Sequence, residues 1–530
     1  MPISDCSPSY ADPRPAPADH LRVSADHHVV TPFEEARRRA YDIVVVGGGG
    51  TAAVFLTGLL RLRPEARVLV LEQGPFLLPS HAQNLGLAFQ PLMASAVASP
   101  WRSEGELEVV AQVPYLGGRT LVWSGSCPQP SLEQLAGWPD ALVRDLEGYW
   151  DPAKELLGVQ PADALGPEYA VLQDQMAASV WMAAGESESL SLPASEKDLS
   201  APIAQSTVDS GATERFSGVS HLLRAKAAQP GTVDIVTECA VHGMTQEDGR
   251  IRTLSTDQGA LDVAGADIVL AMGAIEATRL VLSSFPDAPR SGAGNNLGSN
   301  TASFLTCRLP RGAFQGLSDD RAELAALYVD GATADREFHL HVTACATTDR
   351  ARDLSRIYRL LPDMFGDDTP QRVSDPDHVI LLVHGLAQLA GDPASPSASS
   401  VTLGSDGATV GTYRLSPADR AVWDAMDEAA DAVLRQLAGG APLEYWDPQH
   451  ATWSSTPPDR RMPFAYHEAG TLRMGTSPED SVTDLYGRLR LTENVHVLGG
   501  ATFPTRGSWN PFLTMAALAL RLADHIGKNT

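Results

Sequence analysis

Cysteine is scarce in this chain: there are five among 530 residues, and no two of them form a C-x-x-C pair. Neither a disulfide framework nor a thiolate metal site is therefore indicated, and a cytoplasmic protein is expected. Long apolar runs are also lacking, which argues against a membrane span. Residues 1–40 are rich in Pro, Ala, Asp and His and lack the apolar core of a secretory signal, so they are predicted to form a tail or surface arm.

Positive charge is in deficit as well. The chain has 40 Lys and Arg against 65 Asp and Glu, giving a formal net charge of −25. Phosphate binding needs basic patches, so nucleic acid and anionic membranes are excluded as expected partners. At this length one hydrophobic core rarely suffices, so two domains, or one domain with insertions, can bury a cofactor.

A glycine-rich turn is the first motif that is present. "YDIVVVGGGGTAAVFLTGLLRLRPEARVLVLEQG", residues 41–74, predicts strand, turn, helix and strand. Within it, Gly47-x-Gly49-x-x-Ala52 allows close approach of a pyrophosphate to a helix start, with Gly50 and Thr51 in the same turn. Glu72 ends the second strand, where a carboxylate can accept hydrogen bonds from ribose hydroxyls. This context predicts a dinucleotide-binding unit and an α/β fold.

The rest of the chain predicts an insertion into that unit. The nucleotide-binding domain is expected over 41–305, with a helical or loop insertion at about 130–215, and to resume over 466–530. Alternating segments such as "EFHLHVTACA" and "HVILLVHGLAQ" predict an antiparallel sheet in a substrate domain over 306–465. A helix is predicted to start at Ser416 with a capping box completed by Asp419.

Four further segments carry a family resemblance. They are "YLGGRTLVWSGSCP" (115–128), "DIVLAMGAIEATRLVLSS" (267–284), "HEAGTLRMG" (467–475) and "NVHVLGGATFPTRGSWNPFLTMAALALRLADHI" (494–526). With the N-terminal glycine turn, they resemble the glucose–methanol–choline (GMC) family of flavin oxidoreductases, and most of all its pyranose oxidase and sugar dehydrogenase branch. The resemblance implies a Rossmann-like FAD-binding domain with an inserted substrate domain built on an antiparallel sheet.

The resemblance also assigns residues to the site. It implies His467 and Asn510 as the catalytic pair. Val122 stands where pyranose oxidases carry a histidine bonded to flavin, which implies non-covalent FAD. The residues placed on FAD are Gly47, Gly49, Gly50, Thr51, Glu72, Gly117, Gly118, Thr120, Val241, Gly273, Gly500, Ala501, Asn510, Pro511 and Phe512.

The implied reaction is oxidation of an alcohol to a carbonyl, with hydride transfer to flavin N5. Because an alcohol is a very weak acid, a positioned base is needed, and a neutral histidine such as His467 suits that task. Asn510 followed by Pro511 predicts that Asn510 is the N-cap of a helix and that the positive N-terminal end of this helix faces the flavin. The expected substrate is a sugar, glycoside or polyol, and molecular oxygen or another acceptor would take up the electrons.

Several alternatives remain at this point. The same fold could serve a lyase with redox-silent FAD, or an NAD-dependent enzyme could use only the first unit. His467 could be a packed core histidine, and Asn510 could be only a cap. His339 and His341 share one face of a strand, but two histidines without a third ligand do not make a zinc site, so no metal is predicted and both are expected to line the cavity or pack against it.

Overall fold

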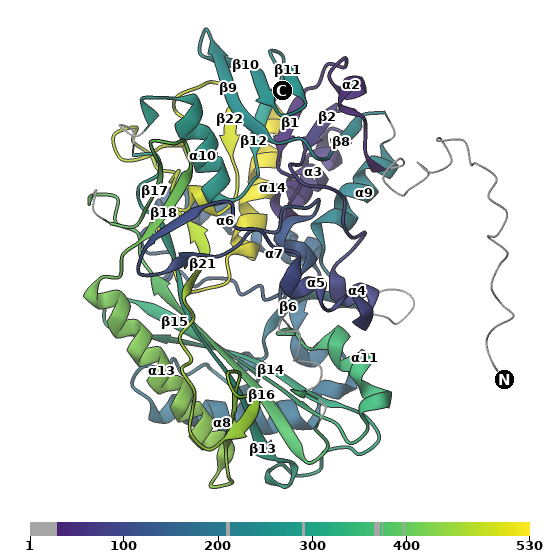
Figure 1. Ribbon diagram of the computed structural model, residues 1–530, viewed down its shortest axis with the longest axis vertical. Coiled ribbons are helices and arrows are strands. Elements are labelled where there is room, and N and C mark those ends of the chain that lie inside the picture. The colour runs from purple at the N-terminus through teal and green to yellow at the C-terminus, as the bar shows by residue number, and fades with distance from the viewer. Residues whose placement is uncertain are drawn as a thin grey trace, which may run out of the picture.

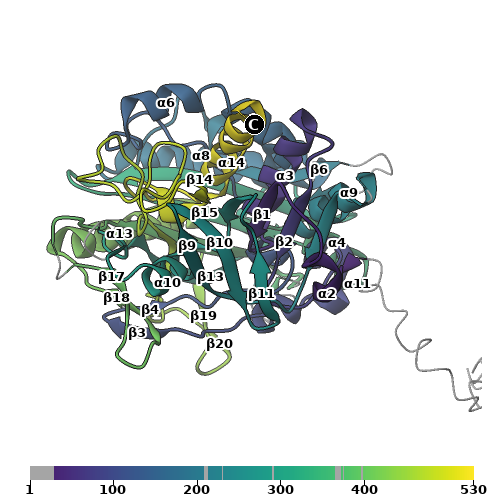
Figure 2. The ribbon, with the colours of Figure 1, turned by 90° about the horizontal axis from the view of Figure 1, so that it is seen from above.

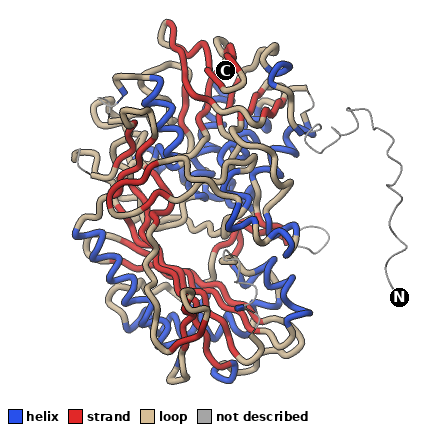
Figure 3. Tube along the Cα trace, in the orientation of Figure 1, coloured by secondary structure: helices blue, strands red, loops and turns tan. Residues whose placement is uncertain are grey.

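The computed structural model describes residues 29–207, 213–229, 231–288, 292–364, 372–373, 375–395 and 398–529. Residues 1–28 of the predicted arm lie outside this description. The chain folds into two regions, one above the other in Figure 1, and each is built on its own sheet. Figure 3 shows the strands of both regions in red and the helices in blue.

Five parallel strands form the sheet of the upper region, in the order β22 (Val495–Val497), β12 (Asp267–Leu270), β1 (Ile43–Val46), β2 (Val68–Leu71) and β8 (Val233–Val236). Each strand pairs in parallel with its neighbours. The strands come from the start, the middle and the end of the chain. The predicted α/β class is confirmed.

The side chains of this sheet alternate between two packed faces. Ile43 and Val45 of β1 belong to one core cluster, and Val44 and Val46 belong to another. Burial on both faces accounts for the uninterrupted apolar run in the sequence. The helices α3 (Gly50–Leu62), α9 (Gly218–Ala228) and α14 (Phe512–Asn529) cover the first face, with α3 packed against both others.

The second face is covered by α10 (Ala274–Ser284) and by a three-stranded sheet of β9 (Val241–Glu247), β10 (Arg250–Thr256) and β11 (Gly259–Asp262). Figure 2 shows α3 and α14 on one side of β1, with α10 and this small sheet on the other. The parallel sheet therefore lies between two packed layers, and the carboxyl ends of its strands point toward the lower region (Figure 1).

An eight-stranded sheet forms the lower region, as predicted for the middle of the chain. Its main path is β14 (Glu323–Ala332), β15 (Glu337–Ala346), β16 (His378–Leu389), β13 (Gly298–Pro310), β19 (Glu444–Asp447) and β20 (Thr452–Ser454). The pairings along this path are antiparallel. β21 (Phe464–Ala469) pairs with β13 and with β4 (Glu108–Val109), which connects this sheet to the C-terminal motif.

The helices α8 (Val171–Glu186) and α13 (Pro417–Ala438) cover the outer face of the lower sheet. The predicted capping box of α13 is confirmed: Ser416 N donates to Asp419 Oδ2 at 2.8 Å, and Asp419 N donates to Ser416 Oγ at 3.2 Å. On β15, Phe338, Leu340 and Val342 face these helices. The alternate positions, His339 and His341, therefore face the upper region.

The remaining elements fill the sides of the molecule. Two small sheets contain β17 (Ser400–Leu403), β18 (Thr409–Tyr413) and β3 (Arg102–Gly105), and β5 (Val159–Pro161), β6 (Pro202–Thr207) and β7 (Thr213–Arg215). Short helices are α2 (Phe33–Ala36), α4 (Ala82–Leu85), α5 (Leu92–Ser95), α6 (Asp140–Leu146), α7 (Trp150–Leu157) and α11 (Arg350–Leu360). Within the described ranges, no helix has the length and apolar character needed to cross a membrane.

Candidate active site

A cavity of about 550 Å³ extends from the strand ends of the parallel sheet to the inner face of the antiparallel sheet. Its wall includes Gly47 after β1 at one end and His341 of β15 at the other. Most of the residues assigned from the sequence line this cavity. They are Gly47, Gly49, Gly50, Thr51, Glu72, Gly118, Thr120, Val241, Gly273, His467, Gly500, Asn510, Pro511 and Phe512.

Two assigned residues do not line it. Gly117 lies behind Gly118 with φ of +106°, and a side chain there would meet Leu121 and Val219. Ala501 is buried in the short 3-10 helix Gly500–Thr502 and is 1% exposed. Both residues shape the backbone beside the cavity, and their sequence-based assignment to the cofactor site stays a prediction.

The glycine turn has the geometry needed for close approach of a ligand. Gly47 has φ of +97°, and a Cβ at this position would lie 2.6 Å from the carbonyl oxygen of Ala271. Gly49 precedes the first turn of α3, and a Cβ there would meet no atom within 4 Å. The N-terminal amides of α3 therefore face open space beside the cavity wall, an arrangement that suits a pyrophosphate.

Glu72 follows β2 and is buried at the cavity wall. Its carboxylate accepts hydrogen bonds from Gly48 N at 2.8 Å and from Gly74 N at 3.0 Å. Burial raises the pKa of Glu72, although these two backbone donors act in the opposite direction. Each carboxylate oxygen keeps further lone pairs, so the predicted acceptor for ribose hydroxyls is held in place by the turn that it follows.

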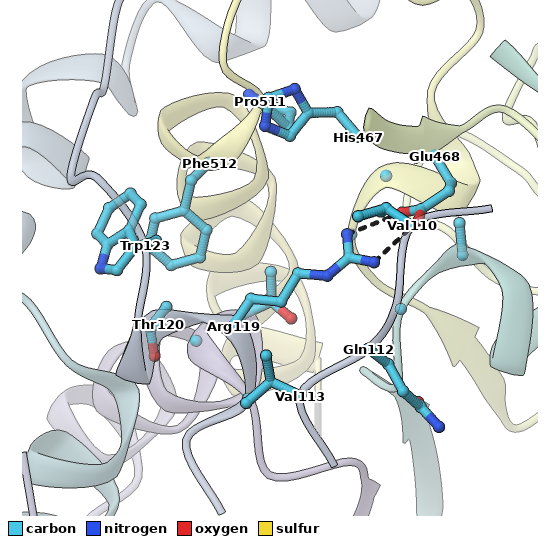
Figure 4. A pocket seen from close by; sticks show the side chains of 18 of the residues that line it. Val110, Gln112, Val113, Arg119, Thr120, Trp123, His467, Glu468, Pro511 and Phe512 are labelled. Atoms are coloured by element: carbon cyan, nitrogen blue, oxygen red, sulfur yellow. Dashed lines mark hydrogen bonds and ion pairs between the residues drawn. The ribbon is translucent and has the colours of Figure 1, made fainter. Parts of the chain in front are cut away.

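An ion pair that sequence reasoning missed crosses the cavity. The guanidinium of Arg119 donates to both carboxylate oxygens of Glu468, each at 2.8 Å (Figure 4). Arg119 belongs to the "GGRTLVW" segment, and Glu468 directly follows His467. The pair therefore ties the glycine loop at 117–118 to the strand that carries the predicted base. The only signal in the sequence was that each residue adjoins a recognised motif.

His467 has an unusual backbone conformation. It lies in β21 with φ of +64°, which side chains other than glycine rarely adopt. The register between β13 and β21 shifts here, since Gly298 pairs with Ala469 but Asn300 pairs with Tyr466. A bulge of this kind redirects one side chain, and such strained positions cluster at functional sites. The imidazole of His467 lines the cavity.

Asn300 fixes the tautomer of His467. The Oδ1 atom of Asn300 lies 3.0 Å from His467 Nδ1, and it accepts from Arg506 Nη2 at 2.6 Å. The orientation of this amide is settled because its Nδ2 group donates to three backbone carbonyls, those of Ala387, Gly507 and Ser508. Nδ1 of the histidine must therefore carry the hydrogen, which leaves the Nε2 lone pair as its acceptor.

The surroundings of His467 also favour its neutral form. Burial, followed by the positive charges of Arg506 and Arg119, lowers the pKa of His467 well below its ordinary value. Arg506 is itself buried, and burial lowers its pKa to about 9. A neutral imidazole with a defined tautomer can accept a proton from a bound hydroxyl group.

Asn510 lies at the start of α14, but not in the role expected for an N-cap. Met515 N donates the first helical hydrogen bond to the carbonyl oxygen of Pro511, so Pro511 occupies the N-cap position and the predicted cap was wrong by one residue. The Oδ1 atom of Asn510 instead lies 2.9 Å from His341 Nε2 and accepts from Ser126 Oγ at 3.2 Å. The Asn510 side chain therefore makes its hydrogen bonds at the cavity wall and not with the backbone of α14.

The two histidines of β15 have different places. His341 lines the cavity and contacts Asn510. His339 lies behind that wall with no exposed surface, and its ring stacks on Tyr328 with centroids 4.7 Å apart. One of the pair therefore lines the cavity and the other packs against it, which covers both expectations from the sequence.

Other residues at or behind the cavity wall were not assigned from the sequence, although Ser126, Glu276 and Arg506 lie within the quoted segments. Asn300 and Arg506 support His467 from segments far along the chain. Additional polar and aromatic residues on the wall are Trp101, Ser126, Glu276, Phe304, Asp363, His384 and Tyr466. Their contributions depend on tertiary contacts that no short motif encodes.

Comparison with known proteins finds relatives in one family of oxidoreductases. Residues 395–519 match the family model of the C-terminal part of the GMC oxidoreductases, described as "GMC oxidoreductase". Relatives that align along most of the chain include proteins named as GMC-type oxidoreductases. The C-terminal part of the chain is therefore similar to the GMC oxidoreductases, and relatives that align along most of the chain are named as oxidases or oxidoreductases.

Individual relatives differ in how much of the chain they cover. Paromamine 6'-oxidase of Streptomyces fradiae is 26% identical over 538 aligned positions, which cover 92% of this chain and 91% of that protein. The match to 2-methyl-1,2-propanediol dehydrogenase of Mycolicibacterium austroafricanum is 41% identical but spans only 66 residues, 12% of each chain. The crystal structure of pyridoxine 4-oxidase from Mesorbium loti has a TM-score of 0.58 at 16% identity and covers 92% of this chain and 99% of that one, which shows a shared fold.

Proposed function

We propose that this protein oxidises an alcohol group of a sugar, glycoside or polyol-like compound to a carbonyl, using non-covalently bound FAD. The observation that carries the proposal is the contact between His467 and Asn300, which leaves a neutral Nε2 acceptor on the wall of the cavity. The match of residues 395–519 to the GMC oxidoreductase family model supports the reaction class.

The cavity fits FAD at the end formed by the parallel sheet. The open N-terminus of α3 at Gly49 suits the pyrophosphate, and Glu72 would accept from the ribose. When bound, FAD supplies the acceptor for the two electrons and the hydrogen lost from the carbinol carbon. Val122 lines the cavity in the "GGRTLVW" segment, and an aliphatic side chain cannot form a bond to the cofactor.

His467 would act as the general base. Because its Nδ1 donates to Asn300, Nε2 would take the hydroxyl proton as the carbinol hydrogen leaves. Its lowered pKa keeps the imidazole neutral near pH 7. A well-placed base of this kind contributes on the order of 10² to 10⁴ in rate.

Asn510 would orient the reacting oxygen. Its Oδ1 atom is held by His341 and Ser126, so its Nδ2 group is left to donate, and no described residue accepts from it. A hydrogen bond to the substrate oxygen would stabilise the negative charge that develops there during deprotonation. The Asn510 side chain thus serves the substrate, while Pro511 starts the helix.

The full-length relative named paromamine 6'-oxidase supports a carbohydrate-like substrate. The electron acceptor would be molecular oxygen or another oxidant, because both oxidases and dehydrogenases occur among the relatives. The pyranose oxidase and sugar dehydrogenase branch remains our assignment within the family.

Anaerobic addition of alcohols and sugars to the yellow holoprotein tests this proposal. Bleaching of the flavin absorbance with formation of the carbonyl product is expected, and admission of air then shows whether oxygen restores the colour quickly. Turnover without any bleaching would instead support a lyase of the same fold with redox-silent FAD, and colourless purified protein would exclude a flavoenzyme.

A further inference from the structure

The wall of the cavity nearest the antiparallel sheet differs in character from the cofactor end. Phe304 of β13 and His384 of β16 are paired across the strands, with ring centroids 4.3 Å apart. Tyr466 of β21 lies beside Phe304 at 5.8 Å. Asp363, from the segment after α11, completes this wall, which has aromatic surface and one carboxylate.

Asp363 is buried without a full set of partners. It is 5% exposed, its Oδ1 atom lies 3.6 Å from His384 Nδ1, and its Oδ2 atom has no hydrogen-bond partner among the described residues. Burial alone would raise the pKa of this carboxyl, but His384, His341 and Arg215 hold it below its ordinary value. The side chain is therefore an anion with unused acceptor capacity.

The other carboxylates on the cavity wall are all engaged by strong donors. Glu468 is paired with Arg119, Glu276 accepts from Trp101 Nε1 and Arg279 Nε, and Glu72 accepts from two backbone amides. Leaving a buried acceptor unpaired costs free energy comparable to a lost hydrogen bond, and more for a charged group. Asp363 is the exception on this wall, and it lies away from the glycine turn.

A structural role for Asp363 would be to balance the buried charge of Arg215. The guanidinium of Arg215, however, already donates to neutral acceptors: the side-chain oxygens of Gln83 and Gln205 and the carbonyls of Leu360 and Pro362. Asp363 acts on Arg215 only through its longer-range field, which raises the pKa of that guanidinium. The Oδ2 atom remains unpartnered despite this cation.

We propose that Asp363, with Phe304 and Tyr466, forms a subsite for a protonated amine, so that the substrates are alcohols that also carry an ammonium group, such as amino sugars. This inference rests on the proposed alcohol oxidation. An ammonium would donate a charge-assisted hydrogen bond to Asp363, and the aromatic rings would favour a cation over a neutral group.

The position of the subsite suits a compact substrate. His341 Nε2 lies 2.9 Å from Asn510 Oδ1, and the negative charge of Asp363 acts to raise the pKa of the same imidazole against the effect of burial. The amine subsite and the reacting centre are thus linked through a single side chain. The hydroxyl and the amine of a substrate would be separated by a few bonds, as in one sugar ring.

Matched substrate pairs test the subsite. Anaerobic flavin reduction is measured with D-glucosamine against D-glucose, with the corresponding methyl glycosides, and with N-acetylglucosamine as a neutral analogue. Wild-type protein is expected to favour the free amines at least tenfold in kcat/KM over both neutral forms. Asp363→Asn should keep the flavin and lose most of this preference, because a neutral amide can accept a hydrogen bond from an ammonium ion but cannot form an ion pair with it.

Asp330→Asn is the matched control. Asp330 is a largely buried carboxyl of β14 that contacts Gln134 and does not line the cavity, so this variant should retain the preference.

Equal rates with amines and neutral alcohols in wild-type protein, or an undiminished preference in Asp363→Asn, would overturn the subsite while leaving alcohol oxidation intact. Absence of flavin reduction with every alcohol would contradict the proposed function itself. If Asp363→Asn fails to fold, the subsite is tested by comparing free with N-acetylated amines in wild-type protein. Equal rates with the two forms would then overturn it.

Discussion

The Oδ1 atom of Asn300 lies 3.0 Å from Nδ1 of His467, and this contact joins two strands whose register shifts at that point. Arg506 donates to the same oxygen. The contact fixes which imidazole nitrogen carries the hydrogen, and it brings a buried cation close enough to oppose protonation of the ring. The orientation and the protonation state of the proposed base thus depend on one amide side chain.

Asn300→Asp should change the pH dependence of flavin reduction. A carboxylate beside Nδ1 would stabilise the charged imidazolium and raise the pKa of His467. Because the base works only when neutral, the rate should begin to fall at a higher pH than in wild-type protein. Anaerobic reduction rates at saturating substrate, from about pH 5 to about pH 8, measure this shift.

Asn296→Asp provides the matched control. Asn296 is buried and donates its amide to the carbonyls of Gly470 and Pro504, so its replacement removes similar hydrogen bonds near the same strand. Its pH profile should follow that of wild-type protein. Identical profiles for Asn300→Asp and wild-type protein would show that Asn300 does not govern the protonation of His467.

The wild-type profile should be flat through the ordinary titration range of histidine. Burial, Arg506 and Arg119 lower the pKa of His467, so the neutral form persists as the pH falls below that range. The rate should therefore decline only at still lower pH. A decline centred near the ordinary histidine pKa of about 6.5 would contradict the electrostatic description of the site.

Asn510→Asp should slow flavin reduction on the order of 10²-fold without loss of the fold. A carboxylate can still accept hydrogen bonds from His341 and Ser126, and the helix start at Pro511 does not depend on this side chain. The variant would lose the amide donor and place a negative charge where the substrate oxygen becomes negative. Thermal melting and single-turnover reduction, measured together, test both parts. Wild-type rates in the folded variant would leave Asn510 without a role in the reaction.

FAD should be released completely when the protein is denatured. By the resemblance to pyranose oxidases, Val122 stands where those enzymes carry a histidine bonded to the flavin, and an aliphatic side chain cannot form such a bond. Acid precipitation should leave all the yellow colour in the supernatant. Colour retained by the pellet would reveal an attachment residue elsewhere on the cavity wall.

Local patterns predicted the fold well. The apolar run at Ile43–Val46 indicated a strand buried on both faces, and the glycines after it indicated a turn into a helix, because each signal depends on neighbouring residues only. The capping box at Ser416 was equally local. The Asn510 cap failed because its side chain contacts His341 of β15 and Ser126 of the 115–128 segment, not the backbone of the adjacent helix.

The interactions that organise the site could not be predicted in the same way. Asn300 and His467 are 167 positions apart, and Arg119 and Glu468 are 349 apart. The left-handed backbone of His467 depends on the register between β13 and β21, which a single sequence does not specify. Asp363 follows a short helix without any motif, and its significance depends on partners supplied by other strands.

Single-turnover reduction of bound FAD by an alcohol substrate, in wild-type protein and His467→Ala, tests the central claim most directly. His496→Gln serves as the control, because His496 is a buried histidine of β22 that does not line the cavity. We expect all three proteins to bind FAD, and His467→Ala alone to be slower by roughly two to four orders of magnitude, as for loss of a general base. Equal reduction rates in His467→Ala and wild-type protein would contradict the assignment of His467 as the base.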